Sequence, residues 1–229
     1  TSLTFTLDLN MTLKLYKTET SPGVRAVQMT AELLKLNYVQ LELDLQNKEN
    51  MSPEYLEKNP LHSVPFLEDG DFYLADSHAI ITYLVSKYGA EQLATLYPND
   101  LCLKATVDQR LYFDTSILFP TSKKIVKAMI NDGISAPTKQ HIEEMNDAYG
   151  IMEKYLQKTK FIAADHVTVA DVSCVASISS AAMLVPIDDS FPNLKAWLST
   201  LEKEDWYKKG NVLGLNMLEK FLKSIGFLA

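Results

Sequence analysis

Apolar and polar residues alternate without interruption in the stretch VQLELDLQ, residues 39–46. Because side chains of a β-strand point alternately to opposite faces, this pattern predicts a half-buried strand. Its inward-facing positions would be Val39, Leu41, Leu43 and Leu45. Leu13 and Leu15 predict an earlier strand, and between the two strands apolar residues recur at helical spacing over residues 24–34. The start of the chain therefore predicts a β-α-β unit.

A hairpin and a capped helix follow this unit. The stretches VPFL, residues 64–67, and FYLA, residues 72–75, flank the turn sequence EDGD, so we expect them to pair as antiparallel strands. The segment DSHAIITYLVSKYG begins with cap-type residues at Asp76 and ends at Gly89, which predicts a helix. A loop and a short helix precede the hairpin. This order of elements predicts a thioredoxin-like α/β domain over residues 11–89.

The pattern changes after Gly89, because strand-like alternation ends there. Residues 90–98 predict a linker, and residues 99–229 predict an all-helical domain. Helices are expected over residues 99–119, 122–131, 138–157, 169–184, 192–202 and 216–224, separated by Pro120, DGISAP and VPIDDSFPN. Thr168 has the spacing of a capping box with Asp171, which predicts a cap on a buried helix. Residues 1–10 form an N-terminal extension for which the sequence indicates no packing partner.

Composition excludes several classes of function. The 229 residues contain 22 Lys and Arg against 29 Asp and Glu, and the net charge of −7 argues against binding to nucleic acid, which needs clustered basic side chains. No apolar run approaches the roughly 20 residues that cross a bilayer, and the start TSLTFTLDLN lacks the basic and apolar regions of a signal peptide. We therefore expect a cytoplasmic protein that does not engage a membrane. The two cysteines, Cys102 and Cys174, form no CxxC pair, so any thiol chemistry must come from a ligand.

Three places in the first domain could together hold a peptide-like thiol. Ser21 precedes Pro22 at a helix entrance, where its hydroxyl can cap the helix or act as a donor to a bound anion. The backbone at Val64, before a proline, can remain free to pair with an extended ligand. Asp76 and Ser77 stand at a helix N-terminus, where N–H groups favour a carboxylate and Asp76 can hold an amine.

These motifs resemble those of the insect delta and epsilon cytosolic glutathione S-transferases, and the details lean towards epsilon. The shared motifs are the Ser-Pro pair after the first strand, NPLHSVP, the acidic-Ser pair of DSHAI, and TVAD in the helical domain. SPGVRAV and DQRLYFDTSILFP carry the finer resemblance, which extends from about Leu13 to the last helix. The resemblance implies the glutathione S-transferase fold. It also implies a homodimer that pairs the first domain of one subunit with the helical domain of the other.

The resemblance implies roles for the residues of these motifs. Ser21 would be the catalytic residue that stabilises the thiolate of glutathione, the backbone of Val64 would pair with its cysteinyl part, and Asp76 with Ser77 would hold its γ-glutamyl end. His62 and the residue at position 50 would meet the glycyl end. The complete set expected to bind glutathione is Asn50, His62, Ser63, Val64, Pro65, Asp76, Ser77 and His78.

The second substrate would lie against the helical domain. The residues expected to form its hydrophobic pocket are Pro22, Tyr112, Phe119, Lys123, Met217, Leu218 and Phe221. Two positions depart from the family pattern. Many relatives have a histidine where this chain has Asn50, which would weaken or replace that contact, and we expect the change at Gly23 to be minor.

The expected reaction joins reduced glutathione, a co-substrate, to hydrophobic electrophiles in detoxification, and it needs no metal. Alternatives are a non-catalytic protein that sequesters hydrophobic ligands in the same cleft, a glutathione-dependent peroxidase or isomerase, and a structural adaptor that retains only the fold. Each motif also has a purely structural interpretation. Ser21 and Asp76 can be simple helix caps, Tyr112 and Phe119 can serve a helical core, and Lys123 can be an ordinary exposed charge.

Overall fold

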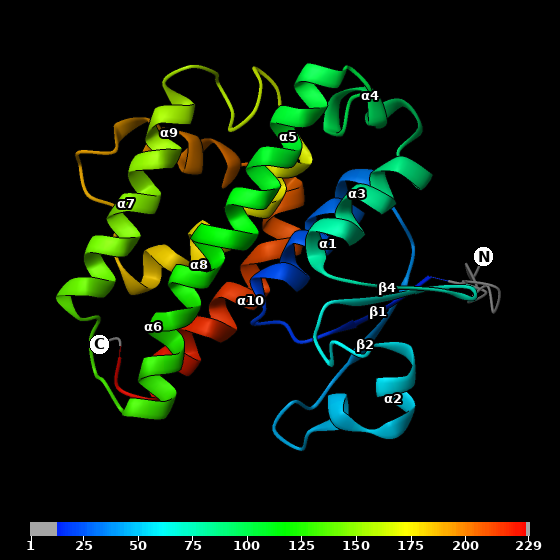
Figure 1. Cartoon of the computed structure of the whole chain (residues 1–229), viewed down its shortest axis with the longest axis horizontal. Coiled ribbons are helices and arrows are strands. Elements are labelled where there is room, and N and C mark those ends of the chain that lie inside the picture. Colours follow the sequence, from blue (N-terminus) through cyan, green and yellow to red (C-terminus); the bar gives the residue numbers. More distant parts are fainter. Residues whose placement is uncertain (1–12, 228–229) are drawn as a thin grey trace, which may run out of the picture.

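The computed structural model describes residues 13–227 and contains a four-stranded sheet followed by a helical domain (Figure 1). The predicted extension, residues 1–10, lies outside the described residues. The strands are β1 (Leu13–Lys17), β2 (Val39–Glu42), β3 (Phe66–Asp69) and β4 (Phe72–Ala75). Their order in the sheet is β2-β1-β3-β4, with β1 parallel to β2 and antiparallel to β3, and β3 antiparallel to β4.

Three helices accompany this sheet and complete the predicted thioredoxin-like domain. They are α1 (Pro22–Leu34), the short α2 (Pro53–Lys58) after the 3₁₀ turn η1 (Glu49–Met51), and α3 (Ser77–Tyr88). Figure 1 shows α1 and α3 on the side of the sheet that faces the helical domain, with α2 on the other side. The predicted hairpin is confirmed, with Phe66 opposite Ala75, although β3 begins two residues later than the apolar stretch.

The prediction of a long half-buried strand over residues 39–46 is wrong in both its length and its burial. β2 stops at Glu42 and has no buried side chain, with Val39 36% exposed, and Leu45 beyond it is 39% exposed. The Asp44 carboxylate accepts the backbone N–H groups of Gln46 at 2.9 Å and Asn47 at 3.0 Å, which turns the chain out of the sheet. Apolar and polar residues go on alternating in the sequence after the turn at Asp44, so the pattern alone overestimates the length of the strand.

The second domain is helical, as predicted. The expected linker contains the 3₁₀ turn η2 (Ala90–Gln92) and the one-turn helix α4 (Leu93–Leu96). The elements that follow are α5 (Leu101–Phe113), a π-helical turn η3 (Asp114–Leu118), α6 (Phe119–Asp132), α7 (Lys139–Leu156), α8 (Val169–Leu184), α9 (Pro192–Leu201) and α10 (Asp205–Ser224). Helix α8 is the centre of this domain, and nearly all its side chains are buried. The Asp171 carboxylate accepts the backbone N–H of Thr168 at 2.8 Å, so the predicted capping interaction is present.

Two predicted helix boundaries are wrong. Pro120 does not separate two helices, because α5 continues into α6 through the π-helical turn, and the hydroxyl of Thr121 satisfies the carbonyl of Ile117 at 2.7 Å. The last helix begins at Asp205 and not near residue 216. The buried residues of its first half include two glycines and Asn211, which do not produce the aliphatic periodicity used to recognise a helix.

Helix α1 joins the two domains, since it packs against α8 and α10 as well as α3. Arg25, fully buried on α1, donates to the carbonyl of Ala176 at 3.2 Å and to the side chains of Ser180 and Asn211. At Gly214 of α10, an added Cβ would lie only 2.2 Å from the carbonyl oxygen of Glu19. This close approach fixes the N-terminus of α1 against the helical domain.

Candidate functional site

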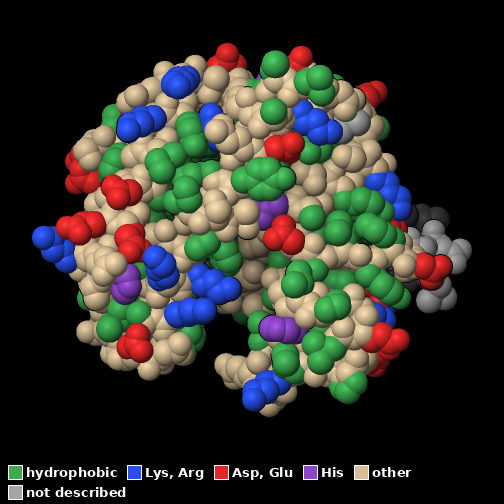
Figure 2. Space-filling model, in the orientation of Figure 1, with side chains coloured by type: hydrophobic (Ala, Val, Ile, Leu, Met, Phe, Trp, Pro, Cys, Tyr) green, Lys and Arg blue, Asp and Glu red, His purple; other side chains and the backbone are tan. Residues whose placement is uncertain are grey.

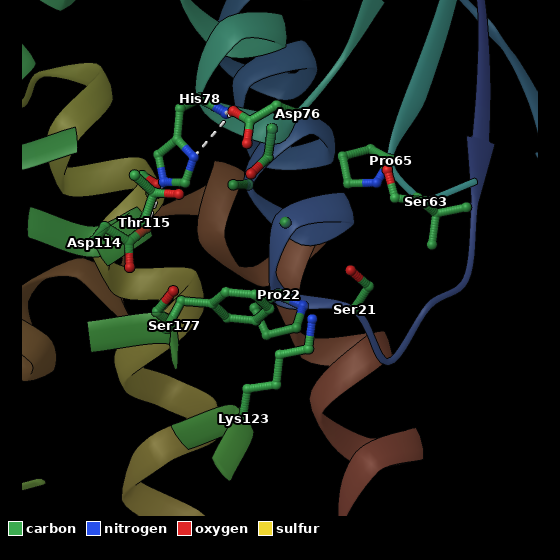
Figure 3. Close-up of a pocket in the computed structure, with 16 residues that line it drawn as sticks. Ser21, Pro22, Ser63, Pro65, Asp76, His78, Asp114, Thr115, Lys123 and Ser177 are labelled. Atoms are coloured by element: carbon green, nitrogen blue, oxygen red, sulfur yellow. Dashed lines mark hydrogen bonds and ion pairs between the residues drawn. The ribbon is translucent and has the colours of Figure 1, made fainter. Parts of the chain in front are cut away.

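A cavity lies where the N-termini of α1 and α3 meet helices of the second domain (Figure 3). The sheet loop before β3 closes one side, and the π-helical turn, α6 and α8 close the other. The residues that line the cavity are Ser21, Pro22, Gly23, Ala26, Ser63, Val64, Pro65, Asp76, Ser77, His78, Asp114, Thr115, Phe119, Lys123, Ser173 and Ser177. The cavity therefore brings together most of the residues that the sequence predicted for one site.

Ser21 stands at the cavity as the N-cap of α1, directly before the proline in the first turn. Its Oγ accepts the backbone N–H of Val24 at a long 3.4 Å. Because the oxygen acts here as an acceptor, its own proton is still available for donation. The structural and the functional interpretation of Ser21 are thus compatible in one geometry.

The loop before β3 presents backbone to the same cavity. The Val64–Pro65 peptide bond is cis, and both residues line the cavity with Ser63. The carbonyl of Ser63 accepts the Tyr55 hydroxyl at 2.7 Å and the Asn59 amide at 2.9 Å. These two contacts from α2 and its end hold the loop in position.

Asn50 and His62 do not line the cavity of the described structure. Asn50 instead donates its side-chain amide to the carbonyl of His62 at 2.7 Å, and the imidazole of His62 is exposed. The two residues are adjacent, as the resemblance implied. The departure at position 50 has a structural use here, because the amide ties η1 to the backbone beside Ser63.

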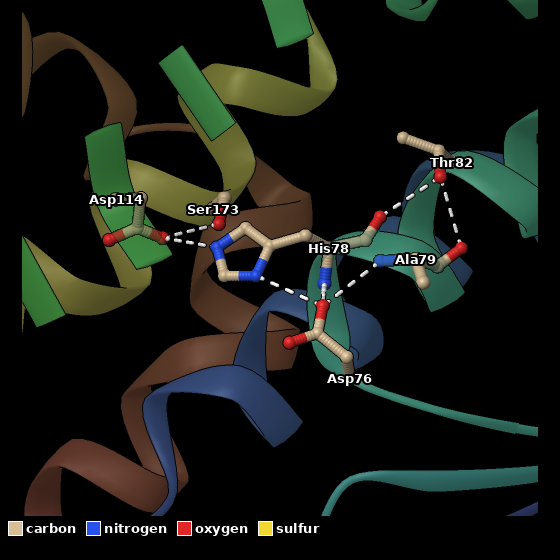
Figure 4. Close-up of polar contacts among 6 residues, drawn as sticks. All are labelled: Asp76, His78, Ala79, Thr82, Asp114 and Ser173. Atoms are coloured by element: carbon tan, nitrogen blue, oxygen red, sulfur yellow. Dashed lines mark hydrogen bonds and ion pairs between the residues drawn. The ribbon is translucent and has the colours of Figure 1, made fainter. Parts of the chain in front are cut away.

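Asp76 caps α3 with one carboxylate oxygen and leaves the other open. Its Oδ1 accepts the backbone N–H groups of His78 at 2.9 Å and Ala79 at 3.2 Å, and it contacts His78 Nδ1 at 3.2 Å (Figure 4). No hydrogen bond to Oδ2 is present among residues 13–227, and the side chain of Asp76 is 49% exposed. The backbone of Asp76 has a φ of 74°, a conformation that is costly for a non-glycine residue and is typical of functional sites.

His78 connects this cap to the helical domain. Its Nε2 lies 3.0 Å from Oδ2 of Asp114, which also accepts the hydroxyl of Ser173 (Figure 4). Burial alone would lower the pKa of His78, but the carboxylates of Asp114 and Asp76 outweigh it and raise this pKa to about 9. At neutral pH His78 is therefore a cation held between two carboxylates. The hydrogen bond from the His78 side chain, followed by the charge of His78 and the backbone N–H groups of Ala79 and His78, lowers the pKa of Asp76.

Asp114, Thr115, Ser173 and Ser177 line the cavity although the sequence did not mark them as site residues. Asp114 is 2% exposed, and within the described part of the chain its Oδ1 has no hydrogen-bond partner. A carboxylate between the apolar stretches LYF, residues 111–113, and ILF, residues 117–119, was the available signal. Its partner His78 is 36 positions away in the sequence, so only the fold shows the pairing.

The pocket predicted for the second substrate is formed only in part. Pro22, Phe119 and Lys123 line the cavity, whereas Tyr112 is 69% exposed and does not. Met217, Leu218 and Phe221 of α10 do not line it either, and Met217 and Phe221 are exposed. The π-helical turn shifts the helical register between Tyr112 and Phe119, so the two rings do not share a face.

Gly23 matters more than the sequence suggested. A Cβ at this position would lie 3.0 Å from Oγ of Ser77 and 3.1 Å from Cδ of Pro65. Any side chain there would require the neighbouring residues to shift by a few tenths of an ångström. The absence of a side chain lets the N-termini of α1 and α3 approach each other beside the cavity.

No cluster of three or more His, Cys, Asp or Glu side chains in residues 13–227 has the arrangement of a metal site. Within the same range no helix has the length and apolar character needed to span a membrane.

Comparisons with known proteins agree with this fold. Residues 15–92 match the family model described as the glutathione S-transferase N-terminal domain, and residues 119–205 match that of the C-terminal domain. The chain is 42% identical over 217 residues to glutathione S-transferase 1 of Manduca sexta, which covers 93% of this chain and 99% of the relative.

Solved structures extend the similarity to three dimensions. An epsilon-class glutathione S-transferase from the housefly, Musca domestica, superposes with a TM-score of 0.89 at 39% identity, covering 95% of this chain and 100% of that one. A glutathione transferase homologue from Drosophila mojavensis, with bound glutathione, gives a TM-score of 0.88 at 39% identity and covers 95% and 99% of the two chains.

Proposed function

The chain belongs to the glutathione S-transferase family, and we propose that it conjugates reduced glutathione to hydrophobic electrophiles with Ser21 as the donor that stabilises the thiolate. Relatives with the same two domains are named glutathione S-transferases, and the related structure from Drosophila mojavensis holds glutathione. The observation that carries the role of Ser21 is its position at the cavity, with Oγ already accepting the Val24 N–H and its proton free.

The protein's task in this reaction is to ionise the thiol and position it. A free thiol has a pKa of ~8.5, so only a few per cent is ionised at neutral pH, and the thiolate is the nucleophile. The O–H of Ser21 donates to the sulfur anion, and the N-terminus of α1 adds a favourable dipole. A hydrogen bond to a charged acceptor contributes roughly 1.5–3 kcal/mol, which corresponds to a shift of about one to two pKa units.

The remaining contacts bind glutathione without taking part in the chemistry. The backbone of Val64 pairs with the cysteinyl unit, and Oδ2 of Asp76 accepts the γ-glutamyl ammonium. The hydroxyl and backbone N–H of Ser77 bind the γ-glutamyl carboxylate, since the next two N–H groups of α3 are donated to Asp76. His78 holds Asp76 in place from behind. The glycyl end extends towards His62, on the side of the loop that Asn50 ties down.

The second substrate lies against Pro22 and Phe119, on the far side of the sulfur from the γ-glutamyl end. With a chlorodinitrobenzene, the thiolate attacks the ring carbon that bears chlorine, the S–C bond forms, and chloride leaves. The thiol proton passes to solvent. We place this reaction in the cytoplasm, where glutathione is kept reduced.

Substitution of Ser21 tests the proposal. In Ser21→Ala, glutathione still binds through Val64, Asp76 and Ser77, but the pKa of its thiol rises towards the free value and conjugation at neutral pH falls at least about tenfold. Thiolate absorbance in the ultraviolet, followed against pH with glutathione bound, measures this pKa directly. Ser21→Thr keeps a hydroxyl and is the matched control, with an expected pKa close to that of the wild type.

Identical titration curves for Ser21→Ala and the wild type would show that Ser21 is only a helix cap. Loss of the cap alone costs about 0.5–2 kcal/mol of stability and leaves the acidity of the bound thiol unchanged. A thermal melt of each variant therefore separates the structural effect from the catalytic one.

A further inference from the structure

Charged groups lie at two sides of the cavity, and they differ in how they are paired. On one side Asp76, His78 and Asp114 form a connected set with each other. On the other side stands Lys123 of α6, one turn after Phe119. No carboxylate within residues 13–227 lies at ion-pair distance from its ammonium. The cavity thus offers one cation that the protein does not neutralise.

Lys123 is directed towards the reacting end of the cavity. Figure 3 shows its side chain extending towards Ser21 and Pro22. Its Nζ lies 5.6 Å from the centre of the Phe119 ring, a weak cation–π contact that leaves the ammonium able to bind an anion. An apolar ring and an unpaired charge therefore stand side by side on one helix.

The neighbouring lysines of α6 differ from Lys123 in ways that help a test. Lys124, the next residue, does not line the cavity and pairs with Glu144 of α7 at 2.8 Å. Lys127 lies one turn further along α6 and is exposed. Figure 2 shows Lys and Arg side chains gathered beside the central hollow of the molecule, although the whole chain carries a net charge of −7. The positive charge beside this hollow is therefore a local feature of an acidic protein.

Glutathione leaves this cation unused if it binds as proposed. Its γ-glutamyl end lies at Asp76 and Ser77, and its glycyl end lies towards His62 on the thioredoxin-like domain. The groups left for the second substrate are Pro22, the ring of Phe119, and the ammonium of Lys123. A purely apolar electrophile would leave that ammonium without a partner and would displace water from it at a cost.

We propose that Lys123 is a specificity-determining residue and that the preferred electrophiles carry an anionic group, such as a carboxylate, on an apolar body. The inference rests on the proposed function, because it assigns the second substrate of the same site. The apolar body packs on Phe119 and Pro22, and the anion pairs with Lys123. The reactive carbon then lies between them and the thiolate beside Ser21.

Two matched probes test this preference. Ethacrynate carries a carboxylate remote from its reactive enone, and its primary amide has the same enone and nearly the same size without the charge. The thiolate adds to the terminal carbon of the enone, the S–C bond forms, and the adjacent carbon takes a proton from solvent. The quantity to measure is the ratio of kcat/KM for ethacrynate to kcat/KM for the amide.

We expect this ratio to fall about two- to fivefold in Lys123→Met, as for the loss of a partly exposed ion pair, and to fall further in Lys123→Glu. Lys123→Arg should keep the ratio. Lys124→Met removes the same charge from the same helix outside the cavity, so it should leave the ratio unchanged. Because the pair is near solvent, the wild-type ratio should also decrease with added salt.

Other outcomes would overturn the inference. An equal loss for both probes in Lys123→Met would show that the side chain serves packing or the thiolate. A raised KM for glutathione with an unchanged ratio would assign Lys123 to a carboxylate of glutathione. Wild-type protein that conjugates a chlorodinitrobenzene but does not favour ethacrynate contradicts this inference alone, whereas protein that conjugates none of the three contradicts the proposed function itself.

Discussion

At the scale of single residues, Asp76 shows how a capping residue can also bind a ligand. Three contacts converge on Oδ1, and the half-exposed carboxylate keeps Oδ2 for the cavity. The capping hydrogen bonds offset the cost of the positive φ angle. The rigid cap and the open acceptor are thus two oxygens of one side chain.

His78 makes the stability of the protein depend on pH. Its folded-state pKa of about 9 lies above the unfolded value of 6.5. A group with a raised pKa contributes stability that is fully present below the unfolded value and is lost as pH rises through the folded value. We expect the free energy of unfolding of the wild type to exceed that of His78→Gln at pH 6, by on the order of 2 kcal/mol, and the difference to shrink by pH 10.

Urea denaturation of both proteins across this pH range measures the difference. His78→Arg, which keeps a charge at every pH, is the informative control, because its stability relative to His78→Gln should not fade between pH 6 and 10. A wild-type advantage that stays constant with pH would mean that His78 stabilises the fold by packing and not by its charge.

Residues whose roles follow from local sequence could be predicted, and those that depend on distant partners could not. Ser21, Asp76 and Thr168 stand next to the helices they cap, so their neighbours in the sequence define them. Asp114 lies within hydrogen-bond distance of His78 through the packing of the two domains, which the sequence does not show. The π-helical turn separates Tyr112 from Phe119, and apolar spacing cannot reveal it.

At the scale of elements, the packing of α1 and of the loop that enters it on α10 depends on two glycines one turn apart. An added Cβ at Gly210 would lie 2.6 Å from the backbone nitrogen of Met29, and one at Gly214 would lie 2.2 Å from the carbonyl oxygen of Glu19. Both obstacles are backbone atoms and cannot rotate away. The backbone from Glu19 into α1 therefore lies closer to α10 than any larger side chain would allow.

We expect Gly214→Ala to lower the free energy of unfolding by about 2–3 kcal/mol, although alanine is the better helix former. The reason is that α1 or α10 must move to accommodate the methyl group. Chemical denaturation measures the loss, and Leu213→Ala, at a position 59% exposed on the same helix, is the control with little expected effect. Unchanged stability in Gly214→Ala would contradict the close approach described above.

Elements with strong local signals were predicted most closely. The hairpin has its turn residues between two apolar stretches, and α3 has Asp76 and Gly89 at its ends. The continuous path from α5 to α6 was missed, because a proline usually ends a helix and the sequence does not reveal the π-helical turn that precedes Pro120 here.

At the scale of the whole molecule, we propose that the protein is a homodimer. Large apolar side chains are exposed on both domains of the single chain, among them Phe72 of β4 and Leu101 of α5. Sedimentation at micromolar concentration should give about twice the mass of one chain. A monomer with full conjugation activity across the concentration range would contradict the proposal.

The burial of Arg25 limits how such a protein can be recombined. The guanidinium of Arg25 extends from α1 of the thioredoxin-like domain and donates to acceptors on α8 and α10 of the helical domain. These acceptors are on Ala176, Ser180 and Asn211. A chimera that joins residues 13–89 to the helical domain of another protein would bury the charge of Arg25 without acceptors, unless that domain has equivalent acceptors. It would also need glycines equivalent to Gly210 and Gly214, so that its last helix could pack as closely. The unit that can be exchanged between such enzymes is therefore larger than either domain, and it includes the first turns of α1 that present Ser21.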